Sequence, residues 1–467
     1  MSSSSIANSQ KRILAHIALF PSAGIGHLLP FLRLAAMLAS PGNYCRVTFI
    51  AVQPPISAAE SNQLSTFFAS HPHINRLDFH LPNPSHFADD DHDPFHARFR
   101  AISRSVPLLH PLLSSLSPSL SAIFADFAVA TDTIGLAEDL SIPLYIVSTT
   151  SALFFSLMAC LPDLTFQSKN VSHDIQLPGL ASVPISSIPL PFFIPDHVFT
   201  AHIRLNVQYL QKAKGILHNC FDWFESETIA ALNNGRVLPH LPPFLPIGPY
   251  KPYDQGVENA KAGSYLHWLD GQPDESVVYV SFGSRTALSK EQITELGNGL
   301  ERSGCRFFWV LKTTKVDKDD KEEIQEVVGD SFLERTKDKG LVIKGWVSQE
   351  QVLGHPAIGG FVSHSGWNSV NEAALFGVPI LAWPQHGDQK INAQVTEETG
   401  LGVWMRHWGW FGENLVKGEE IGEKIIELMR DKTLRVKAKK VKEEARKACE
   451  IGGSSHKTLQ GIIEALK

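Results

Sequence analysis

The sequence predicts an α/β protein built from two doubly wound domains that face a cleft. Its 467 residues are too many for one compact core. Apolar runs typical of strands alternate with segments of helical spacing, a pattern that favours parallel sheets. This alternation stops once near the middle of the chain and then begins again. Because open parallel sheets bind ligands beyond the carboxyl ends of their strands, we expect the site between the two domains.

The first array opens with a near-continuous apolar run at residues 13–20, which predicts a strand buried on both faces. A glycine-containing turn follows it, and residues 28–38 then show helical spacing of apolar side chains. Further strands are expected at 46–52, 122–126 and 144–147. We assign residues 1–245 to an N-terminal Rossmann-like domain.

The segment 239–261 is rich in Pro, Gly, Tyr and Asn and has no periodicity, which predicts an interdomain linker, placed at 246–261. A second array follows in residues 262–451, the predicted C-terminal domain. A helix at 452–467 is expected to pack back onto the first domain. The strands expected in the second array are 276–281, 306–311, 340–344, 359–363 and 379–382, with a helix at 290–301 and others between them.

Charge and composition argue against nucleic acid and membranes as binding partners. The 42 Lys and Arg against 48 Asp and Glu give a net charge of -6, so no global basic field favours nucleic acid. Lysines between 437 and 447 are interleaved with glutamates, which is typical of a solvated helix face. The charge-free stretch 140–162 contains a proline and a Ser-Thr-Thr-Ser run, which favours a buried strand and helix over a membrane span. We expect a monomer with no membrane insertion.

The cysteines and the N-terminus indicate the compartment. Five cysteines without a Cys-x-x-Cys pair disfavour both a disulfide framework and a zinc site, and suit a reducing cytosol. The first twelve residues are polar and lack an apolar core behind a basic start, unlike a signal peptide. The sequence therefore predicts a cytoplasmic protein.

The most informative stretch is 346–389. His364 and Gly366 form a turn that feeds a helix at 367–376, and the free N–H groups and positive dipole end of such a helix suit a diphosphate. His364 can donate to the same anion. Glu372, one turn after Asn368 on the same face, offers an acceptor for ribose hydroxyls. The alternative is a helix cap with surface polar residues.

This stretch closely resembles the signature of the plant secondary-product glycosyltransferases, which use UDP-sugars and have the GT-B fold. The N-terminal turn and the length also fit, so the resemblance covers essentially the whole chain. The residues that carry it are Trp346, Gln349, His355, Pro356, His364, Gly366, Trp367, Asn368, Ser369, Glu372, Gly377, Val378, Pro379, Trp383, Pro384, Gln385, Asp388 and Gln389.

The resemblance implies a role for each donor-site residue. Trp346 would stack on uracil, Gln349 and Glu372 would hold the ribose, and the turn and helix would hold the diphosphate through His364, Gly366, Asn368 and Ser369. The sugar would meet Trp367, Asp388 and Gln389, and Gln389 suggests glucose rather than galactose. Val347, Ser348 and Ser365 differ from common residues of relatives, but the donor needs none of those three side chains.

A second motif is Gly24-Ile25-Gly26-His27 after the first strand. It looks like the start of a dinucleotide fingerprint, but the third glycine and the downstream acid are absent. A histidine at such a turn is more often a cap or structural donor, whereas the resemblance implies a general base. A neutral imidazole with a pKa of about 6.5 can take the proton of a phenol. Asp126 is the expected carboxylate behind the ring, and its alternative is a helix cap.

Further polar and aromatic residues are expected to border the cleft. Ser284 is placed to reach the diphosphate and Thr150 the transferred sugar, although both are equally suited to forming turns. The candidate acceptor-binding residues, which could instead be core aromatics, are Phe95, Phe127, Phe192, Phe193 and Arg285.

We expect no metal and no cofactor besides the UDP-sugar co-substrate. The segment 89–93 contains an Asp-x-Asp, the metal-binding pattern of the other large glycosyltransferase fold. It stands in a Pro/Ser/His loop rather than after a strand, which favours a solvated loop. The 20 histidines show no His-x-x-x-His or His-Glu-x-x-His spacing.

The segments 22–28, 93–95 and 379–389 resemble the flavonoid C-glucosyltransferase branch. That likeness implies an inverting enzyme that moves glucose from UDP-glucose to a carbon of a phenolic acceptor of the dihydrochalcone or 2-hydroxyflavanone type. Three alternatives stay open. They are an O-glucosyltransferase of the same fold, a non-catalytic UDP-sugar-binding protein, and a nucleotide-sugar epimerase.

Overall fold

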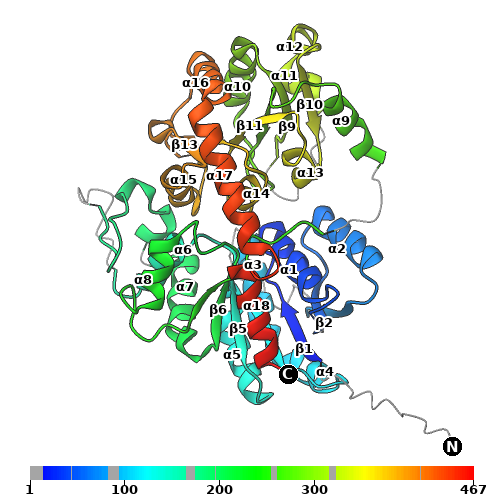
Figure 1. Ribbon diagram of the computed structural model, residues 1–467, viewed down its shortest axis with the longest axis vertical. Helices are drawn as coiled ribbons and strands as arrows, with labels where there is room; N and C mark the ends of the chain where they lie inside the picture. Colours follow the sequence, from blue (N-terminus) through cyan, green and yellow to red (C-terminus); the bar gives the residue numbers. More distant parts are fainter. Residues whose placement is uncertain are drawn as a thin grey trace, which may run out of the picture.

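The computed structural model describes residues 14–43, 45–82, 94–164, 174–194, 196–253, 260–314, 322–410 and 412–467. Two parallel sheets, each flanked by helices, lie one above the other (Figure 1). The predicted α/β class with two doubly wound domains is confirmed. The Asp-x-Asp segment 89–93 lies outside the described residues.

The N-terminal sheet has the order β3-β2-β1-β4-β5-β6-β7, and every neighbouring pair is parallel. The order changes direction between β1 and β4, which makes a topological switch point. The strands are β1 (Ala15–Phe20), β2 (Cys45–Gln53), β3 (Asn75–His80), β4 (Ala122–Asp126), β5 (Leu144–Ser148), β6 (Gly215–His218) and β7 (Phe244–Pro246).

The C-terminal sheet repeats the plan with the order β10-β9-β8-β11-β12-β13, again parallel throughout. Its switch point lies between β8 and β11. The strands are β8 (Val277–Ser281), β9 (Arg306–Leu311), β10 (Gly340–Lys344), β11 (Ile358–Ser363), β12 (Ile380–Ala382) and β13 (Gly402–Trp404).

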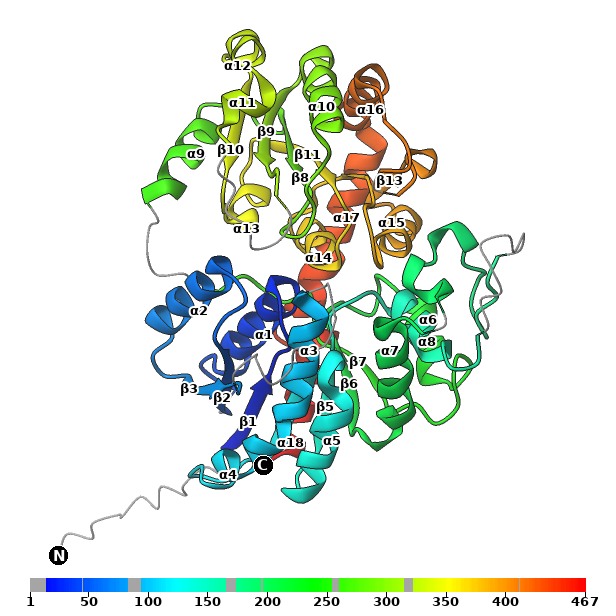
Figure 2. The same cartoon turned by 180° about the vertical axis from the view of Figure 1, so that it is seen from behind.

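Helices cover both sheets (Figure 2). Those of the first domain are α1 (Ile25–Leu38), α2 (Ala58–Ser70), α3 (Pro94–Ser105), α4 (Leu109–Ser114), α5 (Ala130–Asp139), α6 (Ala152–Cys160), α7 (Val198–Tyr209) and α8 (Ser226–Asn233). The remaining helices are α9 (Ala260–Asp270), α10 (Lys290–Ser303), α11 (Ile324–Val328), α12 (Asp330–Thr336), α13 (Gln349–Leu353), α14 (Trp367–Phe376), α15 (Gln389–Glu398), α16 (Gly418–Arg430), α17 (Lys432–Cys449) and α18 (Ser454–Ala465).

The central strands follow from their apolar sequences. Every residue of β1, β4, β5, β8 and β11 is buried, as expected for strands covered on both faces. The sequence missed β3, β6, β7 and β13, which are either short or polar. β7 lies inside the segment 239–261 that composition predicted as a linker, because pairing with β6 rather than its own pattern makes it a strand.

The last two helices join the domains. In Figure 1, α17 descends from the upper domain and α18 lies against the lower one. Leu459, Ile462 and Ile463 of α18 share a buried cluster with Ile17 and Leu19 of β1. Among the described residues, no helix combines the length and apolar character that a membrane crossing requires.

Candidate active site

The candidate site lies where the two switch points face each other. His27 stands in the first turn of α1, just after β1, and Asp126 is the last residue of the neighbouring strand β4. In the other domain, Ser284 follows β8 and His364 follows the neighbouring β11. Polar side chains that are far apart in sequence therefore meet at one cleft of about 660 Å³.

His27 and Asp126 form a close pair. His27 Nδ1 lies 2.7 Å from Asp126 Oδ2, and the carboxylate is almost completely buried. Burial by itself lowers the pKa of His27, but the charge and hydrogen bond of Asp126 outweigh it, so the pKa is raised above 6.5. With Nδ1 directed at the carboxylate, Nε2 is on the opposite edge of the ring, the arrangement of a base with an orienting acid.

Asp126 serves both roles considered for it from the sequence. Its Oδ2 faces His27, while its Oδ1 accepts a hydrogen bond of 2.8 Å from the Ala128 N–H and caps the short helical turn that follows β4. The turn before α1 is fixed as well. Gly24 has φ 93°, a conformation that favours glycine, and its N–H donates to Glu60 Oε1 at 2.6 Å.

The N-terminus of α14, predicted from the sequence to bind a diphosphate, opens onto the cleft. Gly366 is its N-cap and forms no side-chain cap hydrogen bond, so the first N–H groups of the helix lack a cap. Asn368 and Trp367 attach this end to the other domain. Asn368 Nδ2 donates to Gly26 O at 2.9 Å, and Trp367 Nε1 donates to Asn219 O at 3.0 Å. The Trp367 indole N–H is therefore used at the domain interface, while the residue also lines the cleft.

His364 is held in a narrow slot between two glycines. A Cβ built on Gly283 would come within 2.6 Å of His364 Nε2, and one built on Gly366 within 2.5 Å. Burial and the neighbouring His386 lower the pKa of His364 to about 3. The ring is therefore neutral at physiological pH, so it can donate a hydrogen bond but carries no positive charge.

Gln349 and Glu372, which are expected to hold the ribose, form a hydrogen bond with each other. Gln349 Nε2 donates to Glu372 Oε2 at 2.6 Å and to Ser369 Oγ at 2.8 Å. Its Oε1 accepts a hydrogen bond from the Tyr279 hydroxyl at 3.2 Å. Arg33 of α1 donates to Glu372 Oε1 at 2.5 Å. Both carboxylate oxygens are thereby fixed in position at the cleft.

The sugar end of the expected donor site joins the domains through Asp388. Thr150 Oγ1 donates to Asp388 Oδ2 at 2.8 Å, and Asn392 Nδ2 donates to the same oxygen at 2.8 Å. Burial raises the pKa of Asp388, while these two donors oppose the rise. Gln389 bends back onto its own loop, where its Oε1 accepts from the Gln385 N–H at 2.8 Å.

The structure brings the predicted donor-site residues together. All of them line the cleft beside His27 and Asp126. They are Thr150, Ser284, Trp346, Val347, Gln349, His364, Gly366, Trp367, Asn368, Ser369, Glu372, Asp388 and Gln389. Trp346 remains 46% exposed, which leaves its ring accessible as a stacking surface.

The predicted acceptor-binding residues are only partly brought to the cleft. Phe127 and Arg285 line it, whereas Phe192 and Phe193 are not among the lining residues. Phe192 is buried and stacks on Phe154 with 6.1 Å between ring centroids, so it is a core aromatic behind the wall. Phe95 belongs to α3, and its side chain lies outside the part of the chain that the structure describes.

Sequence reasoning missed several lining residues. They are Arg33, Phe99, Arg100, Phe154, Phe199, His202, Lys312 and Glu350. One signal existed for Arg33, since a lone arginine in the apolar helix 28–38 needs an acidic partner when it is buried. The aromatic residues carried no such signal, because a core phenylalanine and a cleft phenylalanine look alike in sequence.

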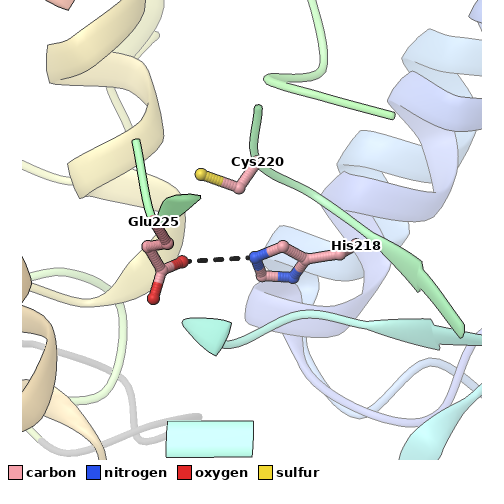
Figure 3. Close-up of side chains that lie close together, drawn as sticks. All are labelled: His218, Cys220 and Glu225. Carbon is pink, nitrogen blue, oxygen red and sulfur yellow. Dashed lines mark hydrogen bonds and ion pairs between the residues drawn. The ribbon is translucent and has the colours of Figure 1, made fainter. Parts of the chain in front are cut away.

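Next to the N-terminus of α6 lies a buried cluster of His218, Cys220 and Glu225 (Figure 3). Glu225 Oε2 and Oε1 accept from the N–H groups of the first two residues of α6, both at 3.0 Å, and His218 Nε2 lies 3.3 Å from Oε2. Burial raises the pKa of the Cys220 thiol well above its usual range, so the thiol stays protonated. The helix-cap contacts account for Glu225.

Comparison with known proteins places the chain in a family. The family model described as "UDP-glucoronosyl and UDP-glucosyl transferase" matches residues 245–414. The chain is similar to UDP-glycosyltransferase 708C2 of Fagopyrum esculentum, with 49% identity over 457 residues that cover 97% of this chain and 95% of the relative. It is also similar to UDP-glycosyltransferase CGT of Oryza sativa subsp. indica, with 45% identity over 95% of this chain and 94% of the relative.

The crystal structure of LpCGTa in complex with UDP has the same fold. It matches with a TM-score of 0.85 and 42% sequence identity, covering 97% of this chain and all of that one. The two facing Rossmann-like domains are thus the GT-B arrangement that the resemblance implied. The chain belongs to the plant UDP-glycosyltransferases, in the 708 family of C-glycosyltransferases.

Proposed function

We propose that this enzyme transfers glucose from UDP-glucose, with inversion, to an aromatic carbon of a dihydrochalcone or 2-hydroxyflavanone. One observation carries the proposal: the His27–Asp126 pair and the N-terminus of α14 line the same cleft from opposite domains. The first is suited to remove a proton and the second to bind a diphosphate. The names of the rice relative and of LpCGTa support the carbon linkage.

In the proposed reaction, His27 Nε2 takes the proton of a phenolic hydroxyl. The resulting phenolate carries negative charge on its ortho carbons, and one of them attacks the anomeric carbon from the face opposite UDP. The bond between that carbon and the UDP oxygen breaks, and its electron pair leaves with UDP. Loss of the ring proton to solvent restores aromaticity and leaves a phenolate, which takes back the proton held by His27. The net products are therefore the C-glucoside, UDP and one proton, with His27 neutral again.

The leaving UDP gains negative charge, which α14 and its neighbours would stabilise. The helix N–H groups at Trp367 to Ser369 and the neutral His364 are suited to this task, with Ser284 beside them. In this proposal, these protein groups stabilise the negative charge of the leaving UDP, and no step uses a metal ion. Asp388 and Gln389 would orient the glucose.

The acceptor side of the cleft suits a flat polyphenol. Phe99, Phe127, Phe154 and Phe199 line it, and Arg285 adds positive charge near His27. An aromatic wall stacks on aromatic rings, while the guanidinium favours a phenolate. We further propose a cytosolic location, which the five free cysteines support.

Product analysis tests the proposal. Purified enzyme is incubated with UDP-glucose and a small panel of dihydrochalcones, 2-hydroxyflavanones and simple phenols, and the products are examined by mass spectrometry and acid hydrolysis. We expect fragmentation within the sugar ring and a glucoside that survives acid. Loss of a whole hexose and release of glucose in acid would identify an O-glucosyltransferase instead. Consumption of UDP-glucose without any acceptor would indicate an epimerase.

A further inference from the structure

Arg33 makes a charged contact across the domain boundary. It lies in α1 of the N-terminal domain and is only 3% exposed. Its Nη2 forms ion pairs with Glu350 of α13 and, at 2.5 Å, with Glu372 of α14, both in the C-terminal domain. One buried guanidinium from the acceptor side thus holds two carboxylates of the donor side.

Arg33 holds only one of the two carboxylate oxygens of Glu372, Oε1. Its other oxygen accepts from Gln349 Nε2 at 2.6 Å, and Gln349 is itself held by the Tyr279 hydroxyl. Arg33, Gln349 and Glu372 all line the cleft. Because each carboxylate oxygen has two lone pairs, each can accept one further hydrogen bond from a ligand hydroxyl.

Without Arg33, two buried carboxylates would lie side by side with no cation between them. Like charges in such a site repel each other, so Glu350 would take up a proton or the two side chains would move apart. Burial and the charge of Glu372 already raise the pKa of Glu350 to about 7, even though Arg33 opposes the rise. A Glu372 side chain that turned away from the cleft would accept hydrogen bonds from a diol less well.

We propose that Arg33 is a positioning residue for donor recognition: its ion pair and hydrogen bond to Glu372 Oε1 hold that carboxylate aimed so that it binds the ribose hydroxyls of UDP. The acceptor domain thereby contributes to nucleotide affinity without touching the nucleotide. The inference rests on the proposed function, because it takes Glu372 as the ribose-binding residue.

Calorimetric titration can isolate this effect. UDP and a UDP analogue that lacks the 2′ and 3′ hydroxyls are titrated into the wild-type enzyme, Arg33→Met and Glu372→Gln. We expect the wild type to prefer UDP by about 10-fold or more, as for hydrogen bonds to a charged acceptor. We expect both variants to lose most of that preference while binding the analogue within about threefold of wild type. In turnover, Arg33→Met should raise KM for UDP-glucose more than it lowers kcat.

Glu350→Gln is the matched control, since it removes the other carboxylate bound by Arg33 and leaves the Arg33–Glu372 pair intact. It should keep the preference for the hydroxyls. Arg33→Lys retains the positive charge but loses the planar fork, and should keep an intermediate preference. If Arg33→Met fails to fold, as judged by thermal unfolding, Arg33→Lys and the double variant Arg33→Met/Glu350→Gln carry the same comparison.

The outcomes separate the two proposals. Equal binding of UDP and the analogue by the wild type would show that the ribose assignment of Glu372, and with it the proposed donor site, is wrong. A wild-type preference that Arg33→Met and Arg33→Lys retain in full would overturn the role of Arg33 and leave the donor site standing.

Discussion

His27 and His364 face one cleft from opposite domains, and their pKa values shift in opposite directions. Burial lowers the pKa of both rings. At His27 the carboxylate of Asp126, 2.7 Å away, reverses that effect and raises the pKa above 6.5. At His364 the neighbouring His386 adds to the effect of burial, and the pKa falls to about 3. The partner, and not the depth of burial, determines whether a cleft histidine takes a proton or only donates one hydrogen bond.

The strongest test of this contrast removes the base. His27→Ala should lower kcat by about 10²- to 10⁴-fold, the usual contribution of a general base. UDP affinity, measured by calorimetry, should stay near wild type because the donor groups belong to the other domain. His110 is exposed on α4 and is not among the lining residues, so His110→Ala is the control. Wild-type turnover by His27→Ala would disprove the base assignment.

Removing the charge of Asp126 should lower the pKa of His27, so that it approaches the behaviour of His364. Asp126→Asn keeps an oxygen that can accept from the Ala128 N–H, so the turn after β4 should survive, but the charge is lost. We expect kcat to fall by about 10²-fold. In the wild type, kcat/KM should rise with pH through a pKa above 6.5, because the base must be neutral to accept a proton. In Asp126→Asn that rise should move to lower pH, and an unmoved profile would contradict the pairing.

Changing His364 should affect binding without affecting the pH profile. His364→Phe removes the ring N–H and should lower kcat/KM for UDP-glucose on the order of 10-fold, the value of a hydrogen bond to a charged group. Since the pKa of His364 is about 3, the profile between pH 5 and 9 should keep its shape. His364→Gln, which retains an N–H donor, should recover part of the loss. A profile that changes shape would mean that His364 ionises.

A smaller effect is expected from the slot that holds His364. Gly283→Ala would put a Cβ 2.6 Å from His364 Nε2 at a residue whose φ is 74°, so both the ring and the backbone must shift. We expect UDP affinity to fall several-fold and stability to fall by about 1 kcal/mol. Gly135→Ala is the control, because Gly135 lies in α5 with no atom within 4 Å of the added Cβ. Equal affinities of the two variants would show that the slot does not position the ring.

The smallest effect concerns the acid beside Arg33. The folded-state pKa of Glu350, about 7, lies above its ordinary 4.5, so the folded state binds this proton more tightly than the unfolded chain does. Its contribution to stability is complete below about pH 4.5 and is lost as pH rises toward 7. Glu350→Gln mimics the protonated form, and its melting temperature should match wild type at pH 5 and exceed it by a few degrees at pH 8, since one pKa unit corresponds to about 1.4 kcal/mol. An equal difference at both pH values would contradict a raised pKa.

Much of the fold was predictable because its central strands are buried on both faces and therefore read as apolar runs. β1 and β8 are of this kind. β7 and β13, with three residues each, carry too little pattern to be found, and only pairing with a neighbouring strand makes them strands.

The donor site was predictable to the same extent. Most of its residues stand within the stretch 346–389, so their spacing is visible. Thr150 and Ser284 stand outside it, and all of the predicted donor-site residues line the cleft. The acceptor side of the cleft was not predictable in this way. Phe127 lines the cleft whereas Phe192 lies behind its wall, and the residue type alone does not encode this difference.

The sequence alone determined the two parallel sheets, the glycine-containing turn at His27 and the turn that carries His364 into a helix, since each depends on local pattern and the chemistry of a few neighbours. Only the tertiary structure decided which charges meet across the cleft. Asp126 is 99 residues from His27, and Arg33 is 339 residues from Glu372. Such contacts depend on strand order and on how the two domains pack, and these in turn set the ionisation of each group at the site.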